Sequence, residues 1–282
     1  MLIGVITVLS VLTAAGLCAG TGAFESLAWL WVLPAGFLGS FLLLAGAAFG
    51  ILLLACAVVD PDKQEENDSK FYRVLTNVCV EAVLQFARIR VHTQGLEKTP
   101  RQGRFLLVCN HLHEADPAVL LHYFRKSQLA FVSKQENRNM FIVGKLMPKL
   151  LCPLINREND REALKTILRC IQLLKDDKVS MAIFPEGYIH KLRKLQHFRP
   201  GVFKIAQKAN VPIVGCTLRN THYVVKNFLK GKPSHVDLHL LEVIPAEELQ
   251  GKTTTEIAQR VYDLMAADLG PENVLTPEEE SA

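Results

Sequence analysis

The sequence predicts an α/β domain with a mostly parallel sheet flanked by helices, preceded by an N-terminal transmembrane hairpin. Two observations lead to this prediction. Residues 1–59 contain one charged side chain, Glu25, whereas all 32 Lys and Arg residues follow residue 60. Beyond that point, short apolar runs alternate with segments of helical periodicity, which is the pattern of α/β folds.

The hairpin prediction depends on two uncharged runs. The first, residues 2–20, spans roughly 28 Å as a helix, close to the hydrocarbon thickness of a bilayer. The second, residues 27–59, would span roughly 50 Å as one straight helix, which is longer than a bilayer requires. Because Pro34 and Gly36 lie near its start, we place the second span at about residues 36–58. Residues 1–59 would then form a membrane anchor.

The charge distribution around this anchor predicts its orientation. A cleaved signal peptide is the alternative for the first run, but no Lys or Arg precedes it, as the basic segment of a signal peptide requires. A hairpin returns the chain to the side on which it began. Since every Lys and Arg follows the hairpin, we expect an integral membrane protein whose C-terminal domain lies on the cytoplasmic side.

The soluble part has a basic bias and scattered cysteines. Residues 61–282 hold all 32 Lys and Arg and 26 of the 28 acidic residues. This excess suits anionic headgroups and phosphates, and we expect a lipid bilayer rather than nucleic acid as its partner. The seven cysteines include no CxxC pair, so they are expected to be buried apolar residues in a reducing compartment.

The remaining elements follow in order. Residues 60–69 form a polar linker, and residues 70–88 show the apolar periodicity of an amphipathic helix, which could pack on the domain or lie on the bilayer. The main domain covers residues 89–270, and an acidic tail, residues 271–282, ends in a segment expected to be disordered from Pro277. Strands are predicted at 104–109, 128–132, 179–184, 211–218 and 235–243, and helices at 116–124, 160–174, 201–209 and 254–268.

A histidine and an aspartate follow the strand that ends at Cys109. The sequence there is Asn110-His111-Leu112-His113-Glu114-Ala115-Asp116-Pro117. One interpretation is structural, with Asp116 as the helix N-cap and Pro117 at the first helical position. The other is catalytic. Neutral imidazole can take a proton from an alcohol at physiological pH, and a carboxylate partner fixes its tautomer and stabilises the imidazolium.

A second block, Phe184-Pro185-Glu186-Gly187, also follows an apolar strand, about 70 residues later. Together the two blocks resemble NHxxxxD and FPEG, the signature motifs of the PlsC-like glycerolipid acyltransferase family. Two weaker blocks, Pro153-Leu154-Ile155-Asn156-Arg157 and Val211-Pro212-Ile213-Val214, are also similar to that family. The resemblance covers about residues 89–220.

The resemblance implies a fold, a reaction and site residues. The domain would have the glycerolipid acyltransferase fold and move an acyl group from acyl-CoA or acyl carrier protein to a lysophospholipid hydroxyl, most simply that of 1-acylglycerol-3-phosphate. His111 would be the general base and Asp116 its partner, with no covalent acyl-enzyme, no metal and no resident cofactor. Arg157, Glu186 and Gly187 would bind the acceptor.

Structural alternatives remain open for two of these residues. Glu186 could instead stabilise its own turn by accepting backbone N–H groups. Arg157 could be a surface ion-pair partner of Glu158 or Asp160, although a guanidinium also suits a phosphate.

The chain departs from the family directly after FPEG. Many members continue with Thr-Arg-Ser, whereas this chain has Tyr188-Ile189-His190. In the family that Arg is thought to help hold the acceptor phosphate, and isoleucine cannot donate to a phosphate. Either Arg157 binds it with help from the basic run Lys191, Arg193 and Lys194, or the acceptor is a different lysolipid or carries no phosphate.

Other enzyme classes fit less well. A metallo-hydrolase motif HxHxDH would need Asp at Ala115 and His at Asp116, so His113 is expected to be an exposed loop residue. Cys109 could be a nucleophile but is expected to be a core residue. The chain has no GxSxG, and the first Walker glycine is absent before Gly251. The non-enzymatic alternative is a membrane-tethered lipid-binding protein.

Overall fold

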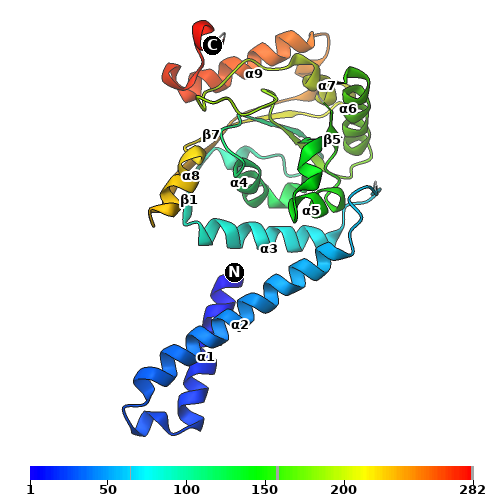
Figure 1. Cartoon of the computed structure of the whole chain (residues 1–282). Helices are drawn as coiled ribbons and strands as arrows, with labels where there is room; N and C mark the ends of the chain where they lie inside the picture. The colour runs from blue at the N-terminus through cyan, green and yellow to red at the C-terminus, as the bar shows by residue number, and fades with distance from the viewer. Residues whose placement is uncertain (64, 157–158, 281–282) are drawn as a thin grey trace.

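The computed structural model describes residues 1–63, 65–156 and 159–280. Its first part is a hairpin of two helices, α1 (Leu2–Gly20) and α2 (Trp29–Ala57), joined by a 3-10 turn at Ala23–Glu25 (Figure 1). Both helices are long and apolar enough to cross a membrane. The second helix begins at Trp29 rather than at residue 36 and contains Pro34. Proline this close to a helix start removes one hydrogen bond but leaves the later turns intact.

Small residues hold the two helices of the hairpin together. Ser10 and Ala14 are buried, and a Cβ added to Gly36 would lie 3.3 Å from the Cα of Ala14. The Ser40 hydroxyl donates to the Ser10 carbonyl oxygen at 3.4 Å. Such small side chains let two helix backbones approach closely, as in membrane helix pairs.

The domain is built on a six-stranded sheet in the order β1-β8-β7-β2-β6-β3. Pairing is parallel throughout except between β7 and β8, so β1 and β8 run opposite to the other four. The strands are β1 (Ile89–Gln94), β2 (Leu106–Cys109), β3 (Leu129–Phe131), β6 (Ser180–Ile183), β7 (Ile213–Arg219) and β8 (Ser234–Ile244). A separate two-stranded sheet pairs β4 (Ser133–Lys134) with β5 (Leu154–Ile155).

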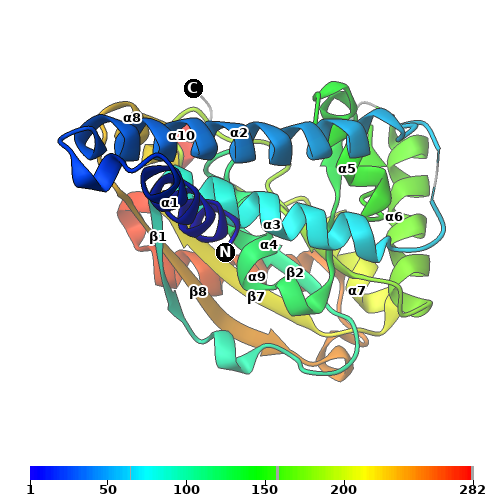
Figure 2. The ribbon, with the colours of Figure 1, turned by 90° about the horizontal axis from the view of Figure 1, so that it is seen from below.

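Helices cover both faces of the sheet and create two apolar cores. The face towards the hairpin carries α3 (Lys70–Phe86), α4 (Asp116–Tyr123) and α8 (Val224–Leu229). The opposite face carries α6 (Asp160–Lys175), α7 (Lys204–Ala209) and α9 (Thr254–Leu269). Figures 1 and 2 show α3 between the hairpin and the sheet, with α9 beyond it. The predicted fold class, a mostly parallel sheet flanked by helices, is therefore confirmed.

A buried ion pair fixes α3 to the domain. Arg73 is 7% exposed, and its Nη2 and Nε donate to the two oxygens of Asp68 at 2.7 and 3.1 Å. Its Nη1 donates to the carbonyl oxygen of Leu129, at the start of β3, at 2.6 Å. α3 also contacts the end of α2 through Tyr72 and Cys79, next to α5 (Val143–Lys149). The helix is therefore part of the domain and joins it to the hairpin.

The C-terminal segment is ordered, so the prediction of a disordered tail is wrong for its described part. The backbone N–H of Leu195 donates to the Asn273 carbonyl oxygen at 2.8 Å, and that of Leu275 donates back to Leu195 at 2.9 Å. Lys194 binds the carboxylate of Glu279, in the short helix α10 (Pro277–Glu280), at 2.7 and 2.9 Å. Pairing with a remote loop supplies the order that the local composition lacks.

The predicted strands and helices of the domain all occur, with ends displaced by about three residues or fewer. Missing from the prediction are β1, the β4–β5 pair, α5 and α8. α5 and α8 have seven and six residues, too few for a periodic pattern to identify them.

Candidate active site

His111 and Asp116 meet at the carboxyl end of β2. His111 Nδ1 donates to Asp116 Oδ2 at 2.8 Å, and the backbone N–H groups of Leu112 and His113 donate to the same oxygen at 2.7 and 2.8 Å. Asp116 is fully buried, whereas the His111 side chain is 19% exposed. With Nδ1 held in this way, Nε2 of His111 is the nitrogen that can accept a proton from a substrate.

The contacts of Asp116 decide between its two interpretations. Its carboxylate turns back to the preceding loop and makes no capping hydrogen bond to α4. Its second oxygen, Oδ1, is buried without a hydrogen-bond partner among the described residues. The capping interpretation is therefore wrong. A buried carboxylate that binds an imidazole is the arrangement that general base catalysis uses.

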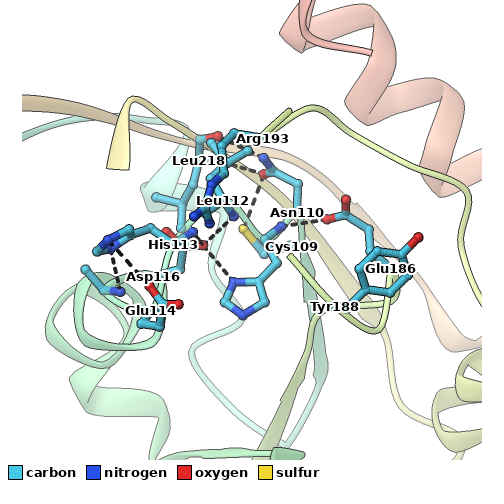
Figure 3. Close-up of polar contacts among 12 residues, drawn as sticks. Cys109, Asn110, Leu112, His113, Glu114, Asp116, Glu186, Tyr188, Arg193 and Leu218 are labelled. Atoms are coloured by element: carbon cyan, nitrogen blue, oxygen red, sulfur yellow. Dashed lines mark hydrogen bonds and ion pairs between the residues drawn. The ribbon is translucent and has the colours of Figure 1, made fainter. Parts of the chain in front are cut away.

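Glu186 approaches the same loop from the end of β6, the strand next to β2. Its Oε1 accepts the backbone N–H of His111 at 2.6 Å, and its Oε2 accepts that of Gln196 at 3.1 Å. Glu186 is 2% exposed, and this burial, together with the charge of Asp116, raises its pKa to about 8. Figure 3 shows Asp116 and Glu186 on opposite sides of the loop.

Glu186 therefore accepts backbone N–H groups, as the structural alternative predicted, but one of them belongs to His111 in the loop after β2. Acceptor binding by Glu186 and Gly187 stays a prediction. Gly187 has a φ of 89°, and a Cβ there would lie 2.8 Å from Arg199 Nε. The turn therefore requires glycine. Arg157, the predicted phosphate ligand, and its neighbour Glu158 lie outside the described residues.

Three further residues fix the loop, and the sequence did not single them out for this role. Asn110 Nδ2 donates to the Leu218 carbonyl oxygen at 2.9 Å, and Asn110 Oδ1 accepts the Leu218 N–H at 2.7 Å, which joins the loop to β7. Arg193 Nη1 donates to the carbonyl oxygen of Leu112 at 2.8 Å. His111 stacks on Phe184, with ring centroids 4.0 Å apart. Only the position of Asn110 beside His111 could have indicated its role, because Arg193 is 81 residues away from Leu112.

Two other residues of the loop can now be placed. Cys109 is fully buried in β2, and this burial raises its pKa well above the usual value, which makes it a poor nucleophile. His113 is not the exposed residue that the sequence predicted. Its side chain is 15% exposed, its Nδ1 accepts the N–H of Ala115 at 3.1 Å, and its Nε2 lies 3.4 Å from Glu114.

Two of the residues that stand in place of Thr-Arg-Ser, Tyr188 and His190, lie in different environments. Tyr188 is exposed, while His190 is 9% exposed and its Nδ1 accepts the N–H of Leu192 at 3.2 Å. In the basic run that follows, Lys194 binds Glu279 and Arg193 binds Leu112. Arg193 and Lys194 are therefore both engaged within the domain.

Comparison with known proteins identifies similar proteins for the domain that carries this site. The family model described as Acyltransferase matches residues 90–219. A 1-acyl-sn-glycerol-3-phosphate acyltransferase of Borreliella burgdorferi is 24% identical over 188 residues, which are 65% of this chain and 74% of that protein. A chloroplastic 1-acyl-sn-glycerol-3-phosphate acyltransferase of Brassica napus is 30% identical over 149 residues, 52% of this chain and 42% of that one.

The fold has a solved counterpart. The crystal structure of PlsC, the 1-acyl-sn-glycerophosphate acyltransferase of Thermotoga maritima, superposes with a TM-score of 0.58 and 19% identity, covering 78% of this chain and 86% of that one. At this identity the likeness concerns the fold. Residues 90–219 match the Acyltransferase family model, so the chain contains an acyltransferase domain, which is similar to the PlsC-like glycerolipid O-acyltransferases and has the PlsC fold.

Proposed function

We propose that this protein transfers a fatty acyl group from a thioester to the hydroxyl of a lysophospholipid, with 1-acylglycerol-3-phosphate as the acceptor and phosphatidate as the product. The relatives described above are named for this reaction. The donor is acyl-CoA or acyl carrier protein, as the family resemblance implies. The other candidates are acylation of a different lysolipid and lipid binding without catalysis.

The proposed mechanism assigns one proton transfer to His111. Its Nε2 accepts the proton of the acceptor hydroxyl while that oxygen attacks the thioester carbonyl carbon. The C–S bond then breaks, and the imidazolium returns the proton to the leaving thiolate, so the products are an ester and a free thiol. Asp116 stabilises the imidazolium and holds Nδ1 as the donor nitrogen. No residue forms a covalent acyl intermediate.

The single observation that carries this proposal is the triple hydrogen bonding of Asp116 Oδ2. One oxygen accepts the imidazole N–H and two backbone N–H groups, all between 2.7 and 2.8 Å. A carboxylate that needed only to start a helix would point the other way. A lipid-binding protein would have no need to hold a buried carboxylate against a partly exposed imidazole.

The proposal includes an integral membrane location with the catalytic domain in the cytoplasm. The support is the apolar hairpin and the confinement of every Lys and Arg to the part of the chain that follows it. A lysolipid acceptor and its product both stay in the bilayer, which suits a domain held at its surface.

The test is a product analysis with the purified full chain. Oleoyl-CoA is supplied with lysophosphatidate, lysophosphatidylglycerol, lysophosphatidylcholine or monoacylglycerol in turn, and both thiol release and lipid products are measured. We expect phosphatidate to form fastest. His111→Ala should remove the reaction, whereas the matched control His92→Ala, an exposed histidine of β1, should retain it. Transfer by His111→Ala within about twofold of the original rate would overturn the mechanism, and faster use of another acceptor would reassign the substrate.

A further inference from the structure

α8 exposes an apolar and basic surface that the reaction does not use. This six-residue helix follows β7, and its side chains Val225, Phe228 and Leu229 are all exposed, Leu229 by 78%. The next residues include Lys230 and Lys232. Large apolar side chains gathered at an exposed tip mark a surface that contacts another apolar phase or molecule.

The end of α3 extends this surface. The rings of Phe86 and Phe228 lie 5.4 Å apart between centroids, and Phe86 is 69% exposed. Arg88, two residues after Phe86, donates from Nη1 to the carbonyl oxygen of Gly231 at 2.6 Å. The tip after α8 is therefore fixed to the end of α3. We call Phe86, Val225, Phe228 and Leu229, with the lysines that surround them, the α8 surface.

The position of the α8 surface identifies what it faces. Figure 1 places α3 and α8 at the end of the domain from which the hairpin extends, with α9 at the opposite end. The amino group of Met1, at the start of α1, pairs with Glu81 of α3. If α1 crosses the bilayer, its first residue lies at the bilayer surface, and α3 lies there with it. The α8 surface is thus continuous with the membrane face that the hairpin defines.

The charge of the α8 surface fits the same environment. Residues 221–236 contain Lys226, Lys230 and Lys232 and no acidic residue. Lysines around an apolar tip bind anionic headgroups while the apolar side chains enter the interface. A partner protein would need acidic side chains at positions that match these lysines. An anionic leaflet can pair with them however the protein is rotated about the membrane normal.

We propose that the α8 surface is a second membrane contact, separate from the hairpin, with Phe86, Phe228 and Leu229 in the interface and the three lysines on anionic headgroups. The proposal rests on the membrane location proposed above. It has a consequence for the site, because β7, which leads into α8, also holds the catalytic loop through Asn110 and Leu218. The catalytic edge of the sheet is then held beside the leaflet that contains the acceptor.

The test uses the depth of a single tryptophan in the full chain. The two native tryptophans, Trp29 and Trp31, both lie in the hairpin and are changed to Phe. Leu229→Trp is then introduced, and the protein is reconstituted into liposomes that contain phosphatidylglycerol and lipids brominated near the glycerol. We expect strong quenching and blue-shifted emission. The matched control is Leu168→Trp, an exposed leucine of α6 on the opposite face of the sheet, which should stay unquenched.

Three outcomes decide the proposal. Equal quenching at positions 229 and 168, or none at 229, overturns it. The tryptophan at position 229 could instead be protected at a low lipid-to-protein ratio and lose this protection as the ratio rises. That result would mean that a second copy of the chain covers the α8 surface, and it would also overturn the proposal. Quenching at 229 alone supports it, and does so whether or not the protein transfers acyl groups, so this result is independent of the proposed reaction.

A kinetic arm tests the consequence for the substrate. We expect the double variant Phe228→Glu and Leu229→Glu to raise the KM for lysophosphatidate in liposomes several-fold and leave transfer to the same acceptor in detergent micelles unchanged. The control is Leu164→Glu and Leu168→Glu, both exposed on α6, which should leave both unchanged. Equal losses in liposomes and micelles would show that α8 supports the fold instead of the membrane contact.

Discussion

The loop after β2 and the loop after β6 begin at the carboxyl ends of two neighbouring parallel strands. Each loop brings one buried carboxyl group to the candidate active site. Asp116 accepts an imidazole N–H and two backbone N–H groups of its own loop on one oxygen. Glu186 accepts backbone N–H groups from two different loops, one on each oxygen. The difference lies in the partner, since Asp116 contacts an imidazole, which the proposed mechanism protonates, whereas Glu186 contacts backbone N–H groups.

Asp116 and Glu186 therefore have different expected roles, the first in proton transfer and the second in holding the loop. In the proposed mechanism, charge on Asp116 stabilises the imidazolium that forms when His111 accepts a proton. The Glu186 carboxyl holds the backbone of His111 in position relative to Gln196, in the loop after β6. We therefore expect changes at Asp116 to alter the rate of the chemical step, and changes at Glu186 to alter geometry and stability.

The largest expected effect is that of Asp116→Asn. The amide keeps the size of the side chain but loses the charge and favours the wrong tautomer of His111, so kcat should fall by about 10²- to 10⁴-fold. Thermal unfolding followed by circular dichroism in detergent should change far less. A variant that unfolds early but retains its specific activity would mean that Asp116 is a structural residue like Glu186.

A smaller effect, about 10- to 100-fold, is expected for Arg157→Ala. Neither Asp116 nor Glu186 offers a cation, so the anionic acceptor phosphate needs a basic side chain elsewhere, and a charge-assisted hydrogen bond is of this strength. KM for the phosphorylated acceptor should rise while slow thioester hydrolysis without acceptor stays nearly constant. Equal damage to both reactions, or to neither, would reopen the identity of the acceptor.

Glu186→Gln should lower kcat by about tenfold, as expected for one impaired hydrogen bond to the loop. Its clearer signature is the pH dependence of stability. Because the pKa of Glu186 is raised to about 8 in the folded protein, above its value in the unfolded chain, the folded state binds more protons between those two values. Stability from this group is thus fully present at low pH and is lost as the pH rises towards 8.

The measurement is Tm between pH 5 and pH 9 for both forms. Glutamine resembles the protonated carboxyl group and does not titrate, so the decline attributable to residue 186 should disappear in the variant. Parallel pH curves for the two forms would show that Glu186 is ionised throughout this range.

The smallest effect is expected for Glu279→Gln at the C-terminal segment. Its ion pair with Lys194 is partly exposed, so Tm should change by less than about 2 °C and activity should not change. The adjacent backbone pairing of Leu195 with Asn273 and Leu275 should keep the segment in place. A large loss of activity would instead show that this segment affects His111, through Gln196 and Glu186. The C-terminal segment would then help to position the loop after β2.

The sequence by itself determined the uncharged hairpin, the α/β order of the domain and the two blocks that carry His111 and Glu186. These features are local, since hydrophobic runs, period and a motif within eight residues can be identified without knowing the fold. The sequence also placed His111 and Asp116 in one loop, five residues apart, which is close enough for the pairing to be predicted.

Only the tertiary structure decided which way the buried groups turn and what fixes them. Whether Asp116 caps α4 or faces His111 depends on the path of the loop, which Leu218, Glu186 and Arg193 hold from three other parts of the chain. The order of residues 271–280 and the position of α8 likewise depend on contacts with Leu195 and Phe86. The physical reason is that local composition sets the preference of a segment, whereas burial, which fixes side-chain direction and shifts the pKa of Glu186, exists only after distant segments have packed.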